Sequence, residues 1–300
     1  MKIFITGGLG FIGRHLSGFF LSQGHRVTAV GTRPSQHLIT HDHFRYISAD
    51  TTRKGTWQDA LQDTDAVINL AGKSIFKRWT QSYKQLIYES RILTTRNLVE
   101  ALPANKGITL CSASGIGFYG NRGNDTLPED ETSGSDFLAG VSRDWEAEAF
   151  RAREKGVRVA TARFGIVLGQ NGGAMEKMVP ALRLFVGGPM GDGSQWFPWI
   201  HLEDLLWAIK FVVEHEKIDG PVNFCAPQAV RNRDFAKIMG RVLRRPAFMP
   251  APGFMIRLIL GEFGTSLLFS QRAVPDKLIS YGFRFKYPEV EAAIRQIVEK

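Results

Sequence analysis

A glycine-rich segment near the N-terminus constrains the fold of this chain more than any other feature. An apolar strand-like run leads into TGGLGFIG at residues 6–13, and a helix-like segment follows directly. Gly7 permits a tight turn, Gly10 lets the backbone approach a diphosphate, and Gly13 lets the helix pack closely on the strand. The diphosphate would rest on the N-terminus of that helix. The segment therefore predicts a dinucleotide-binding turn.

The end of the second strand indicates which dinucleotide is bound. That strand, residues 26–31, leads into Thr32 and Arg33. Chains that bind NAD usually carry an acid about 20 residues past the glycines, where it accepts from the ribose 2′-hydroxyl. This chain has no acid there, and the Arg33 guanidinium matches a 2′-phosphate in charge and shape. The sequence therefore predicts NADP(H) rather than NAD(H) as the cofactor, with Arg14 as a further cation.

The composition is that of an ordinary globular protein. Of 300 residues, 44% are hydrophobic and 22% are charged. We find no apolar run near the roughly 18 residues needed to cross a bilayer, and no leader precedes the glycine turn. We therefore expect a cytoplasmic protein with no membrane partner. Cys111 and Cys225 lie in separate apolar runs and are expected to be buried thiols, with no metal site.

The net charge of +9 is compatible with several kinds of partner. The basic residues are spread along the chain, and we recognise no nucleic-acid-binding motif. We therefore expect no nucleic-acid partner. An anionic cofactor and an anionic small-molecule substrate would suit this balance, as would plain solvated surface.

Strands and helices alternate through the first 165 residues, which predicts an α/β fold with a doubly wound, Rossmann-type parallel sheet. After the second strand, the expected strands are residues 44–48, 65–72, 108–112 and 157–162, with helices at about 80–102 and 137–154. Such sheets bind ligands beyond the carboxyl ends of their strands. The segments that follow these ends, and should line one cleft, are residues 31–33, 50–51, 70–72 and 112–120.

The pattern changes after residue 166, where glycine-rich turns and short elements replace the regular alternation. A seventh strand at residues 220–225 is expected to return to the sheet. We therefore predict two domains: an NADP-binding Rossmann domain at residues 1–165 plus about 196–226, and a smaller C-terminal substrate domain at about 166–195 plus 227–300.

Three motifs give the chain a family resemblance: TGGLGFIG at residues 6–13, NLAG at 69–72 and SASGIGFYG at 112–120. It resembles the extended short-chain dehydrogenase/reductases. Within them it is similar to the YfcH-type epimerase-family branch of the NAD-dependent epimerase/dehydratase superfamily, as indicated by RWT at 78–80, SR at 90–91, FLA at 137–139, WE at 145–146, FPWIH at 197–201 and SQRAVP at 270–275. The resemblance implies an NADP-binding Rossmann domain, a C-terminal substrate domain and a homodimer. It also implies an oxidoreductase or epimerase acting on a sugar-like or small carbonyl or hydroxyl substrate.

The resemblance also carries the cofactor contacts onto positions of this chain. Arg91 falls where extended members usually place an asparagine of the cofactor cleft, and Ile166 and Val167 would border the nicotinamide. The cofactor-binding residues implied in this way are Gly7, Gly10, Phe11, Ile12, Gly13, Thr32, Arg33, Leu70, Ala71, Gly72, Arg91 and Val167.

The catalytic signature of the wider family is missing. The family uses a tyrosine and a lysine four residues later on one helix, where the lysine lowers the phenol pKa. The corresponding positions here are Leu138 and Ser142. Ser114 and Tyr119 are the substitute catalytic candidates, although Ser114 could equally cap backbone and Tyr119 could equally pack. The missing pair leaves open a non-catalytic, NADP-binding regulator or scaffold.

Overall fold

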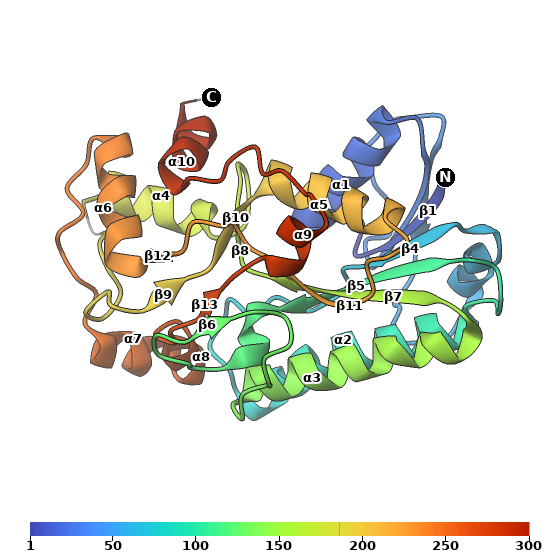
Figure 1. Ribbon diagram of the computed structural model, residues 1–300, viewed down its shortest axis with the longest axis horizontal. Helices are drawn as coiled ribbons and strands as arrows, with labels where there is room; N and C mark the ends of the chain where they lie inside the picture. The colour runs from blue at the N-terminus through green and yellow to red at the C-terminus, as the bar shows by residue number, and fades with distance from the viewer. Residues whose placement is uncertain (186, 300) are drawn as a thin grey trace.

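The computed structural model describes residues 1–185 and 187–299. Its central sheet has seven strands, all parallel, in the order β11-β7-β5-β4-β1-β2-β3 (Figure 1). The strands are β1 (Lys2–Thr6), β2 (Arg26–Gly31), β3 (Phe44–Ser48), β4 (Ala66–Asn69), β5 (Thr109–Gly115), β7 (Arg158–Phe164) and β11 (Gly220–Phe224). The order reverses between β1 and β4, which confirms the doubly wound Rossmann-type sheet.

Helices cover both faces of the sheet, which gives three layers (Figure 1). On one face lie α1 (Phe11–Ser22) and α5 (Leu202–Glu214), and their apolar residues share a core with the sheet. On the other face lie α2 (Gln81–Ala101) and α3 (Phe137–Phe150). Three short 3-10 helices complete this part: η1 (Thr56–Asp63), η2 (Ile116–Tyr119) and η3 (Arg151–Lys155).

The C-terminal part of the chain forms a second lobe with its own core, in which Phe197, Phe235, Met239 and Ile294 are buried. Its helices are α4 (Met175–Arg183), α6 (Asn232–Leu243), α7 (Gly253–Leu260), α8 (Glu262–Ser266) and α10 (Val290–Val298), while α9 (Asp276–Ser280) contacts the main sheet at β11.

Three pairs of short strands lie between the main sheet and the outer helices of this lobe (Figure 1). The pairs are β8 (Ile166–Leu168) with β10 (Trp199–His201), β9 (Trp196–Phe197) with β12 (Val230–Arg231), and β6 (Thr126–Leu127) with β13 (Arg272–Ala273).

The elements lie close to the predicted positions, and the differences have local causes. The strand expected at residues 65–72 ends at Asn69. The Leu70 amide still reaches the Thr6 carbonyl oxygen of β1 at 3.2 Å, but the Ala71 amide bonds to the Thr6 hydroxyl instead of continuing the ladder. The helix expected at residues 137–154 changes to 3-10 geometry after Phe150. Cys111 and Cys225 are buried free thiols, as expected.

The contact between α1 and β1 requires glycine at position 13. A β carbon added to Gly13 would lie 2.3 Å from the Gly7 carbonyl oxygen and 2.8 Å from the Gly8 α carbon. Both are backbone atoms of the preceding turn, so no side chain can move aside. Helix α1 therefore lies as close to the end of β1 as backbone atoms allow.

We predict that Gly13→Ala lowers the free energy of unfolding by about 3 kcal/mol or more, because the methyl group forces α1 away from the turn. Gly18→Ala is the matched control in the same helix, since a β carbon there meets nothing within 4 Å. It should raise the free energy of unfolding by about 0.5–1 kcal/mol through helix propensity. Denaturant titrations measure both, and equal effects of the two changes would contradict the packing argument.

Candidate functional site

The turn between β1 and α1 presents open backbone at the carboxyl edge of the sheet. Gly7 adopts a φ of +66°, which favours glycine, and Gly10 precedes α1 with no side-chain cap on the helix. A β carbon on Gly10 would lie 3.2 Å from the Gly7 carbonyl oxygen. The first N–H groups of α1, those of Phe11 and Ile12, therefore face outward without a capping side chain, in the arrangement that binds phosphate.

A buried hydrogen-bond network sets the neighbouring strand end beside this turn. The Thr6 hydroxyl donates to Asn69 Oδ1 at 2.6 Å and accepts from the amides of Leu70 at 3.0 Å and Ala71 at 3.1 Å. A β carbon on Gly7 would lie 3.0 Å from the Leu70 carbonyl oxygen. The structure thus brings Gly7, Leu70 and Ala71 together, as the sequence analysis expects of a cofactor site.

The ring of Phe11 and its backbone amide lie in different surroundings. Its ring packs on the glycine-rich turn of residues 169–173, where a β carbon on Gly172 would lie 2.2 Å from the ring. The Val167 carbonyl oxygen borders the same turn, 2.9 Å from the β-carbon position of Gly173. The Phe11 side chain therefore joins α1 to the segment after β8 and does not line the glycine turn of residues 7–10.

Arg33 lies exposed in the loop after β2, next to the exposed Thr32. Tyr46 on β3 supports this loop, with its hydroxyl 2.9 Å from the carbonyl oxygen of Gly31 and 2.8 Å from that of Arg33. Within residues 1–185 and 187–299, no carboxylate pairs with the Arg33 guanidinium. The backbone of the loop is fixed while its cation stays available to an anion.

Arg91 on α2 lies against Gly72, whose β-carbon position is 3.0 Å from the guanidinium carbon. The same side chain donates to the carbonyl oxygens of Lys73 at 3.1 Å and Ile87 at 3.0 Å, and it lies 5.1 Å from the Trp145 ring. Burial lowers the pKa of Arg91 to about 10. Arg91 forms no salt bridge with the described part of the chain, so a cation with little hydration faces the end of β4.

Helix α3 carries the positions where the wider family has its catalytic pair. Asp136 caps this helix by accepting from the amides of Leu138 and Ala139. Leu138 lies over η2, with its β carbon 3.4 Å from the β-carbon position of Gly117, and Ser142 is buried. No phenol or ammonium group therefore stands at either position.

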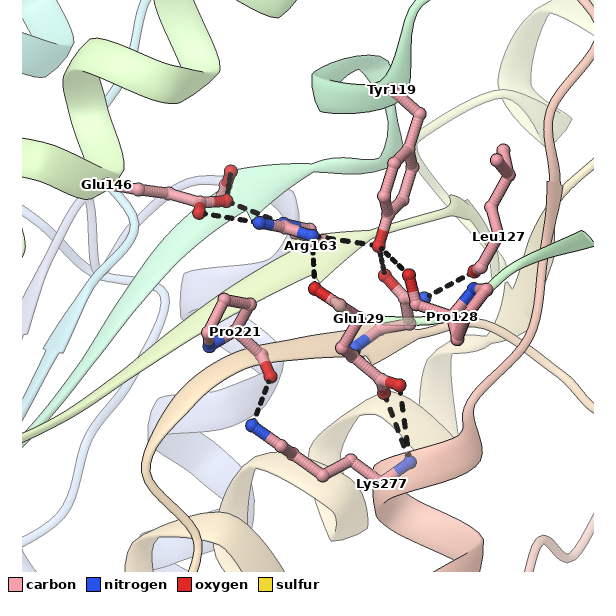
Figure 2. Close-up of polar contacts among 10 residues, drawn as sticks. Tyr119, Leu127, Pro128, Glu129, Glu146, Arg163, Pro221 and Lys277 are labelled. Carbon is pink, nitrogen blue, oxygen red and sulfur yellow. Dashed lines mark hydrogen bonds and ion pairs between the residues drawn. The ribbon is translucent and has the colours of Figure 1, made fainter. Parts of the chain in front are cut away.

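The two substitute catalytic candidates, Ser114 and Tyr119, belong to one buried network around Arg163. Figure 2 shows Arg163 between Glu146 and Tyr119. Arg163 comes from β7 and is 2% exposed, and it pairs with Glu146 of α3 through two nitrogens at 2.8 and 2.9 Å. The Ser114 hydroxyl donates to the same carboxylate at 2.7 Å. Ser114 is thus placed to satisfy a buried carboxylate.

Tyr119 occupies the other side of Arg163 (Figure 2). Its side chain is 0% exposed, and its hydroxyl accepts from Arg163 at 2.8 Å and lies 2.8 Å from Asn223 Oδ1 of β11 and 3.0 Å from the Pro128 carbonyl oxygen. Burial raises the pKa of Tyr119 to about 12. A phenol with these partners is suited to join the strands, which is the packing role that the sequence left open.

The sequence analysis did not single out Arg163, Glu129, Asn223 or Lys277, which complete this network. Glu129 accepts from the backbone amides of Asn223 at 3.0 Å and Lys277 at 3.2 Å, and so joins β11 to α9. One signal was available, because Arg163 is a charged residue within an apolar strand, and such residues are buried only when paired.

A cationic and aromatic group lies where the second lobe approaches the sheet. The guanidinium carbons of Arg231 and Arg272 lie 4.4 and 4.8 Å from the centre of the Trp196 ring. Arg272 Nε is buried and has no hydrogen-bond partner among the described residues. Arg272 belongs to β13, which pairs with β6 beyond the carboxyl end of β5. A buried donor without a partner carries a desolvation cost, which an acceptor bound at this nitrogen would offset.

We predict that Tyr119→Phe lowers the free energy of unfolding by about 1–2 kcal/mol, because Arg163 and Asn223 each lose a buried partner. Tyr88→Phe is the control, since that phenol is 36% exposed and bonds Asp144 at the surface. Denaturant titration should show a loss below about 0.5 kcal/mol there.

The pH dependence of Tyr119→Phe tests the same role. The phenol pKa is about 12 in the folded chain against an ordinary 10.0. The protonated phenol therefore contributes fully to the free energy of unfolding below pH 10, and this contribution is lost as the pH rises through 12. Above pH 10, the free energy of unfolding of Tyr119→Phe should therefore fall less steeply than that of the wild-type chain. Unchanged stability together with lost activity would instead place Tyr119 in catalysis.

Two family models match this chain. Residues 3–225 match the model of the NAD dependent epimerase/dehydratase family, and residues 251–297 match a domain of unknown function, DUF1731. The epimerase family protein YfhF of Bacillus subtilis is 38% identical over 99% of this chain and 98% of its own length. A chloroplastic homologue of SDR39U1 from Arabidopsis thaliana is 37% identical over 100% of this chain and 87% of its own.

Solved structures agree with this assignment. The human epimerase family protein SDR39U1, crystallised with NADPH, superposes with a TM-score of 0.88 at 30% identity and covers 100% of both chains. A UDP-glucuronic acid 4-epimerase from Bacillus cereus has a TM-score of 0.82 at 18% identity over 100% of this chain and 98% of its own, which supports the fold alone. Of the helices described, none is long and apolar enough to cross a membrane.

Proposed function

The chain belongs to the NAD-dependent epimerase/dehydratase family, and we propose that it is an NADP(H)-binding enzyme of the extended short-chain dehydrogenase/reductase type. Its substrate would be an anionic, sugar-like or small carbonyl or hydroxyl compound. The observation that carries the proposal is the uncapped glycine turn at the start of α1, which stands beside the strand end at Leu70 and Ala71.

The residues of this edge fit a dinucleotide with a 2′-phosphate. The N–H groups after Gly10 would hold the diphosphate, and the cradle at Gly7 and Gly10 is one that a β carbon would narrow. Arg33 would take the 2′-phosphate in place of the acid typical of NAD sites. The human relative crystallised with NADPH is consistent with this preference. Arg91 beside Gly72 would add a cation along the cofactor.

We predict that Arg33→Ala raises the dissociation constant for NADPH by roughly tenfold or more and leaves that for NADH unchanged, because only NADPH carries the 2′-phosphate. Arg45→Ala is the control, since it removes an exposed cation from β3 that we assign to no ligand. Isothermal titration of both cofactors measures the ratio. An equal loss for NADPH and NADH would contradict the assignment.

We infer the substrate position from two arginines of the second lobe. Arg231 and Arg272 flank Trp196, and Arg272 Nε lacks a partner, so an anionic group of the substrate would complete this set. The flat indole offers an apolar surface to a sugar or a base. Bound NADP(H) would supply or accept hydride at a carbon that carries a hydroxyl or carbonyl group.

The proton transfer that accompanies hydride transfer has no familiar donor here. Leu138 and Ser142 replace the phenol and ammonium groups of the wider family. Assignment of this role to Ser114 or Tyr119 stays a prediction, and the hydrogen bonds of both hydroxyls favour a positioning role. The homodimer and the cytoplasmic location also stay predictions.

A second candidate is a non-catalytic NADP(H)-binding regulator, and the missing catalytic pair on α3 favours it. The two candidates differ in whether bound NADPH is ever oxidised. We would titrate cofactor-free protein with NADPH and then follow NADPH absorbance against carbonyl compounds and nucleotide sugars, with product analysis for redox-neutral epimerisation. Binding with no conversion of any compound would support the regulator, and failure to bind NADPH would overturn both candidates.

For the substrate found, we predict that Arg272→Gln raises KM at least about tenfold with a smaller effect on kcat, because a charge-assisted contact to the substrate is lost. Arg284→Gln removes an exposed cation elsewhere in the lobe and serves as the control. Equal KM values for the two variants would remove Arg272 from the substrate site.

A further inference from the structure

The outer end of the C-terminal lobe exposes an unusual amount of apolar surface. Leu184, Phe248, Phe254 and Leu258 are 72%, 78%, 70% and 73% exposed. Other large apolar residues of the same end are also exposed, namely Phe185, Met249, Met255 and Ile259. We call residues 184–185 and 244–259 the lobe tip. Contiguous exposed apolar surface usually marks a contact site.

The segments of the lobe tip lie together. The Arg245 guanidinium is 5.3 Å from the Phe185 ring, and the residue 188–190 segment joins residues 249–251 through a backbone bridge. In helix α7, Ile256 is buried and Leu260 packs on the cluster around Phe263. The exposed apolar side chains of this helix are Phe254, Met255, Leu258 and Ile259. In Figure 1, α6 and α7 form the end of the molecule away from the nucleotide-binding sheet.

Positive charge is concentrated at the same place. Residues 233–260 contain six lysines and arginines but one acidic residue, within a chain whose net charge is +9. A hollow of about 370 Å³ opens beside the tip, and its cationic lining residues are Arg233, Lys237, Arg241 and Arg245, with Phe248 among its apolar ones. Of these four cations only Arg241 forms an ion pair within the described chain, with Glu291.

We propose that the lobe tip binds an anionic phospholipid surface. The cations of the hollow would take lipid phosphate groups, and Phe248, Phe254 and Leu258 would enter the acyl boundary. A helix that lies in the interface needs no spanning segment, so the absence of one from the described helices does not count against this contact. The expectation of no membrane partner rested on spanning segments alone.

The charge of the lobe tip favours an anionic bilayer over a second copy of the chain as its occupant. A symmetric contact brings the same patch of both protomers together, so the six cations of residues 233–260 would face six cations with little acid to offset them. An anionic bilayer offers opposite charge and an apolar interior in one surface. The combination of protruding apolar side chains with a cationic hollow is what such a surface requires.

The test is flotation of the full chain with vesicles of phosphatidylcholine alone and of phosphatidylcholine mixed with phosphatidylglycerol. We expect binding to the mixed vesicles only, weakening as salt rises. Phe254→Ser with Leu258→Ser should lower partitioning by about tenfold or more. The matched control is Leu38→Ser with Leu86→Ser, two side chains that are 55% and 48% exposed on the nucleotide-binding part.

A second pair of variants tests the hollow. Lys237→Gln with Arg245→Gln should lower partitioning by roughly tenfold or more, whereas Arg26→Gln with Arg45→Gln removes equal charge elsewhere and should have little effect. All replaced side chains are exposed, and thermal unfolding checks that each variant folds.

Three outcomes would overturn the proposal. One is equal binding of the apolar variant and its control. Another is loss of vesicle binding in inorganic phosphate but not in chloride of the same ionic strength, which would make the hollow a site for free phosphate. The third is a wild-type chain that self-associates through the tip and ignores vesicles, as sedimentation would show.

Discussion

The buried ion pair between Arg163 and Glu146 is the interaction on which the packing of α3, η2 and the segment around Glu129 against the sheet depends. Arg163 binds α3 through Glu146, η2 through Tyr119 and the following segment through the Glu129 carbonyl oxygen. Tyr119 carries the connection to Asn223 on β11. Leaving either charge of such a pair alone in the interior costs about 3–5 kcal/mol, so these elements can hold one arrangement only.

This network also explains why the edge of the sheet carries hydroxyl groups that are not free. Ser114 lies near the end of the central strand β5, where a short-chain dehydrogenase/reductase would place a catalytic hydroxyl. Here the hydroxyl compensates Glu146. The chain keeps the nucleotide turn of its family while it uses the residues around the expected catalytic site to hold a charged pair. Both proposed functions rest on this contrast between the kept glycine turn and the changed catalytic positions.

The two ends of the molecule present different chemistry to anions. At the sheet, the uncapped N–H groups of α1 lie near the end of β4, which the Thr6 hydroxyl holds through the Leu70 and Ala71 amides, and Arg33 follows β2. This arrangement suits one compact dinucleotide. At the lobe tip, cations alternate with protruding apolar side chains such as Phe248 and Leu258, which suits an extended surface. Much of the net positive charge lies at the lobe tip and beside its hollow. Binding of an anionic cofactor therefore does not by itself account for the basic composition of the chain.

The sequence by itself determined the Rossmann-type fold and the nucleotide turn, because both follow from local rules. Strand and helix periods fix the alternation, and Gly7 and Gly13 satisfy backbone constraints within a few residues. Only the tertiary structure decided the partners of Ser114, Tyr119 and Arg163. These side chains come from different elements, and their roles depend on which buried charge lies beside them. A one-dimensional pattern shows that a charge is present, but the packing of sheet, helix and lobe decides whether it is paired or left open to a ligand.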